Sequence, residues 1–221
     1  MIELIDINKR FRDGENHENH VLRGLSLHVA DGEFVAIKGA SGAGKTTLLR
    51  ILGTLLPPDG GTYKLDGVDL TAMGVDLPSI RNAKIGFVFQ DHRLMPQFDV
   101  LQNILLPTLA TQSSSSAEEI AYAQKLMELT HISSLAHQYP NTLSGGEASR
   151  VAVCRALVMK PSVLLADEPT GQLDRENAIN IAQLLTDVNK ELHTTIVMVT
   201  HSDEVSSVAD RVLLLNEGKI A

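Results

Sequence analysis

Apolar and polar residues alternate in two segments near the start of the chain. Residues 2–4 and residues 25–29 both follow this alternation, which is typical of half-buried antiparallel strands. Residues 34–38 form a short apolar run that opens directly into a glycine-rich loop. Further along, the Asp66-Gly67 pair is typical of a tight hairpin. These patterns predict an antiparallel β region beside one buried strand.

Helical spacing of apolar residues follows the glycine-rich loop. It covers residues 46–56, and the two prolines at 57–58 are expected to end the helix. Another short apolar run, residues 85–89, predicts a second buried strand. The order strand, glycine-rich loop, helix is therefore the first local arrangement that the pattern indicates.

The middle of the chain has a different character. From Asp91 onward it is rich in Leu, Gln and Ser, with helix-like spacing and no strong strand pattern. Ser116 and Glu119 have the spacing of a capping box, in which a serine and a glutamate three residues later satisfy the first backbone N–H groups of a helix. We predict an inserted α-helical subdomain over residues 91–157.

The last third returns to β structure. Residues 163–166 and 196–199 are apolar, rich in β-branched residues and separated by a helical segment, as expected of buried parallel strands. Residues 212–218 predict a closing hairpin. The predicted fold class is α/β, with residues 1–221 forming a single domain. Its core, together with an antiparallel β subdomain, comprises residues 1–90 and 158–221.

Composition narrows the functional classes. The chain has 221 residues and a formal net charge of −8, from 19 Lys and Arg against 27 Asp and Glu. This balance argues against a protein that binds nucleic acid through its phosphates, so we expect no nucleic-acid partner. The single Cys154 excludes an internal disulfide and fits a reducing compartment, which favours the cytoplasm. Because no apolar stretch approaches the length of a membrane span, any membrane role is expected to need another chain.

Residues 39–46 read Gly-Ala-Ser-Gly-Ala-Gly-Lys-Thr, a complete phosphate-binding loop between a predicted strand and a predicted helix. Its backbone N–H groups and the helix N-terminus can hold phosphate oxygens, Lys45 can reach the β- and γ-phosphates, and Thr46 can ligate Mg²⁺. A chance glycine-rich turn is the alternative, which the flanking elements disfavour. The predicted ATP-binding positions here are Gly39, Ala40, Ser41, Gly42, Ala43, Gly44, Lys45, Thr46 and Thr47. This loop alone leaves kinases, GTPases and many ATPases open.

Two carboxylates follow the apolar strand at residues 163–166. Asp167 is placed to hold Mg²⁺ through water, and Glu168 to polarise an attacking water as a general base beside the γ-phosphate. The alternative is a pair of carboxylates at the solvent end of a buried strand. The phosphate-binding loop upstream favours the catalytic interpretation.

Leu143, Ser144, Gly145, Gly146 and Glu147 form the sequence that decides the class. It leads into a helix, where Ser144 and the two glycine N–H groups can form a second anion site. An ordinary helix cap with flexible glycines is the alternative. With this motif the chain resembles the ATP-binding domains of ABC proteins. The resemblance implies ATP and Mg²⁺ as cofactors and ATP hydrolysis. It also implies a head-to-tail dimer in which this second site serves the ATP of the partner copy.

The resemblance assigns roles to four more positions. It implies that Phe11 stacks on adenine, that Gln90 senses Mg²⁺ and the attacking water, and that Asp174 lies in a dimer-contacting loop. His201 resembles the histidine that contacts the γ-phosphate, so that Lys45, Gln90, Glu168 and His201 make up the expected catalytic set. Taken singly, Phe11 could be core, Gln90 surface, Asp174 a helix cap and His201 structural.

The chain departs from the family pattern at the start of the signature helix. Ala148 and Ser149 precede Arg150, where the family usually has two glutamines. The phosphate-facing residues are retained, so hydrolysis is expected to survive. The change concerns the first helical turn and its possible contacts with a partner.

Residues 87–90, 94–96, 100–107 and 166–171 resemble the branch that contains LolD, MacB and FtsE. The resemblance implies a permease-type membrane subunit as partner and a peripheral place on the cytoplasmic face of the inner membrane. Its leading function is an ATPase for lipoprotein release or for lipid, peptide or drug export. A regulatory ATPase like FtsE, acting on a division or cell-wall enzyme, is the alternative. A soluble ABC ATPase acting on DNA or ribosomes is disfavoured by the single ATP site and the acidic charge.

Overall fold

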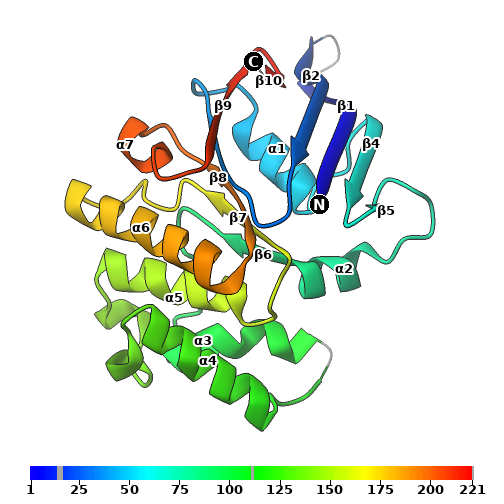
Figure 1. Ribbon diagram of the computed structural model, residues 1–221. Coiled ribbons are helices and arrows are strands. Elements are labelled where there is room, and N and C mark those ends of the chain that lie inside the picture. Colours follow the sequence, from blue (N-terminus) through cyan, green and yellow to red (C-terminus); the bar gives the residue numbers. More distant parts are fainter. Residues whose placement is uncertain (14–16, 111, 221) are drawn as a thin grey trace.

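The computed structural model describes residues 1–13, 17–110 and 112–220, and its two sheets carry the fold (Figure 1). The first is an antiparallel four-stranded sheet in the order β2-β1-β4-β5. Its strands are β1 (Ile2–Asp13), β2 (His17–Val29), β4 (Gly60–Leu65) and β5 (Val68–Asp69). Asp66 and Gly67 both have positive φ, at 52° and 78°, which confirms the predicted tight turn between β4 and β5.

The second sheet has six strands in the order β10-β9-β3-β8-β7-β6, parallel except for β10. They are β3 (Phe34–Lys38), β6 (Ile85–Val88), β7 (Val163–Asp167), β8 (Thr195–Val199), β9 (Arg211–Asn216) and β10 (Lys219–Ile220). The apolar runs predicted as buried strands lie in β3, β6, β7 and β8. Because parallel strands end at the same edge, the segments that follow β3, β6 and β7 come together.

Helix α1 (Lys45–Leu52) lies between the two sheets, as Figure 1 shows. The predicted helix 46–56 was therefore too long at its end. Gly53 caps the helix, and Thr54 takes a left-handed conformation with φ 54°, which stops the helical hydrogen bonding. Gly53 also packs against Phe87, where an added Cβ would lie 3.0 Å from the ring. This close contact favours glycine at the end of the helix.

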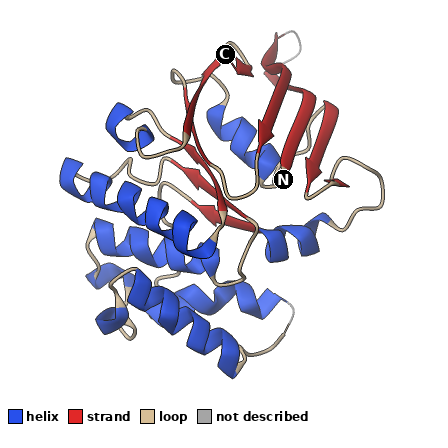
Figure 2. Ribbon diagram, viewed as in Figure 1, coloured by secondary structure: helices blue, strands red, loops and turns tan. Residues whose placement is uncertain are grey.

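The remaining helices lie mainly on the other side of the parallel sheet (Figure 2). They are α2 (Leu77–Lys84), α3 (Val100–Leu105), α4 (Ala117–Leu129), α5 (Gly145–Leu157), α6 (Arg175–Leu192) and α7 (Asp203–Ser206), with short 3₁₀ helices at Leu106–Ala110, Ser133–Leu135 and Pro140–Thr142. The capping box at α4 is confirmed, because Glu119 N donates to Ser116 Oγ at 3.2 Å and Ser116 N donates to Glu119 Oε2 at 2.6 Å. We propose residues 91–157 as the helical subdomain, since α3, α4 and α5 fall within this range.

The parallel sheet separates two apolar clusters. One fills the space among the two sheets and α1, and includes Leu48 and Leu165; the other joins the opposite face of the sheet to α3, α4, α5 and α6, and includes Ala166 and Val151. Alternate residues of β7 therefore contribute to opposite clusters. Within the residues that the structure describes, no helix has both the length and the apolar character needed to cross a membrane.

Candidate nucleotide-binding site

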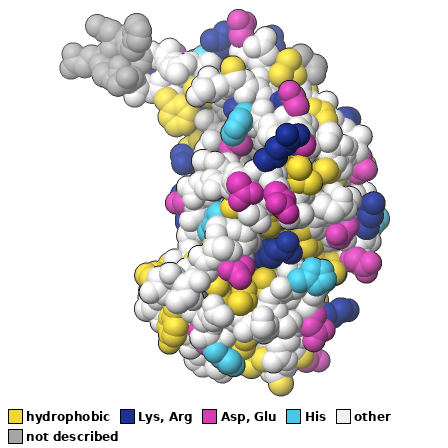
Figure 3. Space-filling view, turned by 90° about the vertical axis from the view of Figure 1, so that its left-hand side faces the viewer, with side chains coloured by type: hydrophobic (Ala, Val, Ile, Leu, Met, Phe, Trp, Pro, Cys, Tyr) yellow, Lys and Arg dark blue, Asp and Glu magenta, His cyan; other side chains and the backbone are white. Residues whose placement is uncertain are grey.

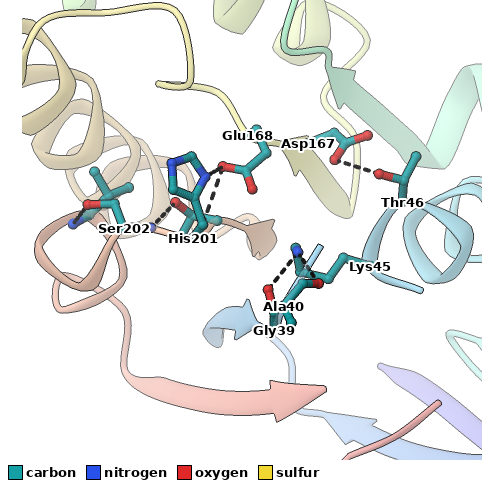
Figure 4. Close-up of polar contacts among 10 residues, drawn as sticks. Gly39, Ala40, Lys45, Thr46, Asp167, Glu168, His201 and Ser202 are labelled. Carbon is teal, nitrogen blue, oxygen red and sulfur yellow. Dashed lines mark hydrogen bonds and ion pairs between the residues drawn. The ribbon is translucent and has the colours of Figure 1, made fainter. Parts of the chain in front are cut away.

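The glycine-rich loop connects β3 to α1 and surrounds the ammonium group of Lys45. Lys45 Nζ donates to the carbonyl oxygens of Gly39 at 2.7 Å and Ala40 at 3.0 Å (Figure 4). Gly42 and Gly44 have φ of 82° and 102°, a region that favours glycine because it has no Cβ. An added Cβ at Gly44 would also meet Val21 at 3.0 Å. The loop thus forms a tight backbone cradle around the ammonium group of Lys45.

Thr46 and Asp167 meet at the carboxyl edge of the parallel sheet. Thr46 Oγ1 donates to Asp167 Oδ1 at 3.4 Å, joining the first turn of α1 to the end of β7 (Figure 4). Burial raises the pKa of Asp167, and the neighbouring carboxylate of Glu168 raises it further. Two side-chain oxygen atoms, of the kind that can bind a divalent cation, therefore lie side by side, and a cation here would favour the ionised form of Asp167.

Glu168 and His201 form the next contact along this edge. His201 Nδ1 lies 2.9 Å from Glu168 Oε2, although the two residues follow different strands, β7 and β8. The side chain of Glu168 is 15% exposed and that of His201 is 73% exposed. Glu168 also has φ 47°, a strained conformation for a residue with a Cβ. The backbone turns sharply here and holds this carboxylate at the sheet edge.

One cavity of about 560 Å³ collects most of the predicted site. The residues that were predicted for the site and line this cavity are Phe11, Ser41, Gly42, Gly44, Lys45, Thr46, Thr47, Gln90, Asp167 and Glu168. Phe11 is 41% exposed, so it is not a core residue, and the ammonium of Lys9 lies 5.7 Å from its ring centroid. Gln90 lies two residues beyond β6, exposed on this cavity and close to Gly171, where an added Cβ would come within 3.2 Å of Gln90 Nε2.

Three further residues line the cavity without having been predicted: Asn19, Val21 and Val199. Asn19 pairs directly opposite Phe11 in the β1–β2 register. The register depends on backbone pairing across a chain reversal, so the local sequence around Asn19 carries no signal for its place. Val199 is the last residue of β8, and only the strand order brings it beside Lys45 and Asp167.

The signature segment lies at the start of α5 and does not line this cavity. Ser144 caps the helix in a capping box: its N and Oγ each lie 2.7 Å from Glu147 Oε2, and Glu147 N donates to Ser144 Oγ at 3.4 Å. These hydrogen bonds from Ser144 lower the pKa of Glu147. Ser144 and Gly145 are exposed. Within one chain, the two predicted anion sites are therefore separate surfaces.

Asp174 caps α6 beside this segment. Its carboxylate accepts from Asn177 N at 3.0 Å and from Asn177 Nδ2 at 2.6 Å, which realises the helix-cap alternative for this residue. Asn177 lies against the signature glycines, because an added Cβ at Gly146 would come within 3.1 Å of its Oδ1. An added Cβ at Gly145 would likewise lie 3.0 Å from Leu173 Cδ2. The caps of α5 and α6 thus pack against each other.

The departure from the family pattern faces inward. Ser149 is 1% exposed, and its hydroxyl donates to the carbonyl of Pro169 at 3.3 Å. Arg150 donates to the carbonyl of Thr130 at 2.9 Å. Ser149 therefore serves the packing of α5 inside the chain and is not available to a partner, while Ala148 is only half-buried.

Comparison with known proteins agrees with this geometry. The family model described as ABC transporter matches residues 22–171. A lipoprotein-releasing system ATP-binding protein LolD from Bordetella pertussis is 45% identical over 201 residues, covering 90% of this chain and 87% of the relative. A macrolide export ATP-binding/permease protein MacB from Rhodopirellula baltica is 43% identical over 223 residues. The match covers this whole chain but only 32% of that relative, so the chain spans about a third of its length.

A solved structure extends the likeness to three dimensions. It is a dimeric, post-hydrolysis state of an ATP-binding cassette bound to ADP and Pi, with a TM-score of 0.88 and 36% identity, covering 100% of this chain and 96% of that one. This likeness confirms the predicted fold class, an α/β fold of the ABC ATPase type. The chain therefore belongs to the ABC transporter family, as an ATP-binding and ATP-hydrolysing subunit of the branch that contains LolD and MacB.

Proposed function

We propose that two copies of this chain close head to tail on two ATP molecules and thereby drive a permease-type membrane partner. The observation that carries the proposal is the separation of the two anion sites: the signature end of α5 is exposed and lies outside the cavity that holds Lys45 and Glu168. One chain alone therefore cannot bring both sites to one γ-phosphate. The dimeric cassette with ADP and Pi supports this arrangement.

The membrane partner is proposed from the relatives. One is part of a lipoprotein-releasing system and another is a macrolide export protein that includes a permease in its name. We infer a peripheral position on the cytoplasmic face of the inner membrane and a role in lipoprotein release or in lipid, peptide or drug export. Basic and acidic side chains are interspersed on the face shown in Figure 3, which is consistent with a protein partner and not with a nucleic-acid backbone.

The residues present fit a magnesium nucleotide. Thr46 and Asp167 supply the hard oxygen ligands that Mg²⁺ prefers, 3.4 Å apart, and Gln90 lines the same cavity. Bound ATP would supply the phosphoanhydride bond, and its Mg²⁺ would neutralise charge on the phosphates. The backbone from Gly39 to Gly44 would hold the phosphates and Lys45 would add a positive charge to them. Phe11 would present its exposed ring to the adenine.

The proposed chemistry of hydrolysis depends on Glu168. Its carboxylate would orient a water molecule and accept the proton that the water loses on attack. His201 holds one oxygen of that carboxylate at 2.9 Å and so fixes its direction. Gln90 would contact the same water, with Gly171 leaving room for its amide. Leu143 and the signature residues 144–147 would complete the site from the second copy.

The test is a set of variants in one assay of ATP-dependent dimer formation. Glu168→Gln should keep ATP binding, lower kcat at least 100-fold, as expected for the loss of a general base, and accumulate as an ATP-bound dimer in sedimentation or size-exclusion measurements. Adding Ser144→Arg to that background should leave nucleotide binding by the monomer within about twofold and abolish the dimer, because the bulky cation blocks the signature end of α5.

Two controls make the result decisive. Lys45→Ala should lose tight ATP binding as well as dimer formation. Glu176→Gln, an exposed carboxylate at the start of α6, should behave like the unmodified chain. Full turnover in Glu168→Gln would refute the general-base role. Equal loss of nucleotide binding in the Lys45 and Ser144 variants would refute the composite site between two copies.

A further inference from the structure

His92 joins two segments that the proposed function needs to act together. Its Nδ1 lies 3.1 Å from the carbonyl oxygen of Gln90, and its Nε2 lies 3.1 Å from the carbonyl oxygen of Gly145. The side chain is buried, with the residue 8% exposed. Gln90 lines the nucleotide cavity, whereas Gly145 is the first residue of α5 and lies 53 positions after His92. One imidazole ring therefore bridges the two halves of the proposed site.

The segment around His92 is held against α5 at a second point. Arg155, in the last turn of α5, donates to the carbonyl of Arg93 at 2.7 Å and to the carbonyl of His92. His92 and Arg93 have φ of 58° and 49°, so two successive residues with Cβ atoms occupy the unfavourable left-handed region. Such a conformation persists only where the surroundings fix it. The ring of His92 and the guanidinium of Arg155 supply that fixation.

Because both acceptors are carbonyl oxygens, the ring can hold them only through N–H groups. A neutral imidazole carries one N–H and donates to one of the two carbonyls, whereas a protonated imidazole donates to both. A phenyl ring would occupy the same buried volume and donate to neither carbonyl. Without the bridge, the Gln90 turn would keep its contact with α5 through Arg155, which lies at the opposite end of the helix from the signature residues. The turn and the signature end of α5 could then move more freely relative to each other. Closure of the dimer would then have to restrict both segments at once, which costs additional conformational entropy.

We propose that His92 is a positioning residue that couples the Gln90 turn to the signature end of α5, so that nucleotide contact at Gln90 aims Ser144–Glu147 at the partner copy. This inference rests on the proposed function. His92 does not line the cavity, and the hydrogen-bond contacts that the structure describes for its ring are with backbone carbonyl oxygens and not with the proposed catalytic side chains. Its removal should therefore weaken dimer closure and leave nucleotide binding by the single chain unchanged.

The experiment compares His92→Phe with His92→Gln, each in the Glu168→Gln chain. His92→Phe keeps the ring and removes the donors, whereas Gln restores N–H donors. Nucleotide affinity is measured on the monomer at low protein concentration, and the dimer dissociation constant by sedimentation with saturating ATP. For His92→Phe we expect monomer affinity within about twofold and a dimer constant raised about fivefold to tenfold, the factor for one ordinary hydrogen bond. His92→Gln should recover at least half of that loss.

His131 provides the matched control. It is also a histidine with positive φ, 58°, but its side chain is exposed. His131→Phe should change neither constant. An unchanged dimer constant in His92→Phe would overturn the proposal, as would a loss in which monomer affinity and thermal stability fall together and Gln does not rescue. If the Glu168→Gln parent itself fails to dimerise with ATP, this result refutes the proposed function and not the role of His92 specifically.

Discussion

His201 makes its contact with Glu168 from an exposed position. Its ring is 73% exposed, and the one polar side-chain partner that the structure describes for it is Glu168 Oε2. Glu168, by contrast, is mostly buried. An exposed side chain contributes little to folding, so the effect of removing it can be attributed to chemistry.

We predict that His201→Ala lowers kcat at least tenfold while KM for ATP changes no more than about twofold, because the carboxylate of Glu168 loses the group that orients it. Steady-state ATPase kinetics measure both constants. Thermal melting should show no change, which serves as the control for folding. A turnover rate equal to that of the unmodified chain would remove His201 from the mechanism.

At the scale of elements, the start of α5 has a pH dependence of its own. Hydrogen bonds from Ser144 to Glu147 lower the pKa of that carboxyl below its ordinary value of 4.5. A lowered folded-state pKa contributes stability that is fully present above pH 4.5 and is lost as the pH falls below it. The capping box therefore stabilises α5 near neutral pH and weakens in acid.

The corresponding prediction concerns Glu147→Gln, which keeps the shape but removes the titrating group. Its free energy of unfolding should be lower than that of the unmodified chain near pH 7, by up to about 1 kcal/mol for a weakened cap. The difference should shrink as the pH falls from 4.5 to 3. Urea unfolding at several pH values measures it. A difference that stayed constant over this range would contradict the ionised capping contact.

The join between β6 and α5 leads to a prediction about packing. An added Cβ at Gly86 would lie 2.2 Å from the carbonyl oxygen of Ala156, a backbone atom that cannot move away alone. Gly86→Ala should therefore lower the free energy of unfolding by about 1–3 kcal/mol, as overpacking in a core does. Gly60→Ala is the control, since its added Cβ would meet Asn8 at an ordinary 4.0 Å. Urea denaturation should separate the two variants; equal stabilities would contradict the close approach.

At the scale of the whole molecule, the cavity sits where the two sheets and the loops after β3, β6 and β7 converge. The signature end of α5 lies on a separate, exposed surface. The same connection, the Gln90 turn with His92, belongs to both. In the proposed dimer, a single chain therefore supplies the cavity of one site and the signature end of the other. This division is the physical basis for proposing that two copies work together.

Parts of this fold were predictable because they are local. The apolar runs now seen in β3, β6, β7 and β8 are continuous since parallel strands are buried on both faces. The capping box at Ser116 and the turn at Asp66 likewise depend on neighbouring residues alone. The short helices α2 and α7 were not predicted. Helix α2 has no buried residue and so shows no apolar face, and α7 has only four residues, too few for a periodic pattern. The strands predicted at residues 2–4 and 25–29 are longer in the structure, where β1 continues to Asp13 and β2 begins at His17. These extensions were missed, since backbone pairing needs no apolar side chains.

The sequence by itself determined the chemistry of the chain: a phosphate-binding loop, two carboxylates after a strand and a glycine-rich helix start, each defined within a few neighbouring residues. Only the tertiary structure decided how these pieces are distributed. It placed Asn19 opposite Phe11, joined His201 to Glu168, turned Ser149 inward and bridged Gln90 to Gly145 through His92. These contacts follow from strand order and helix packing, which depend on residues distant in sequence, and so no local pattern could carry them.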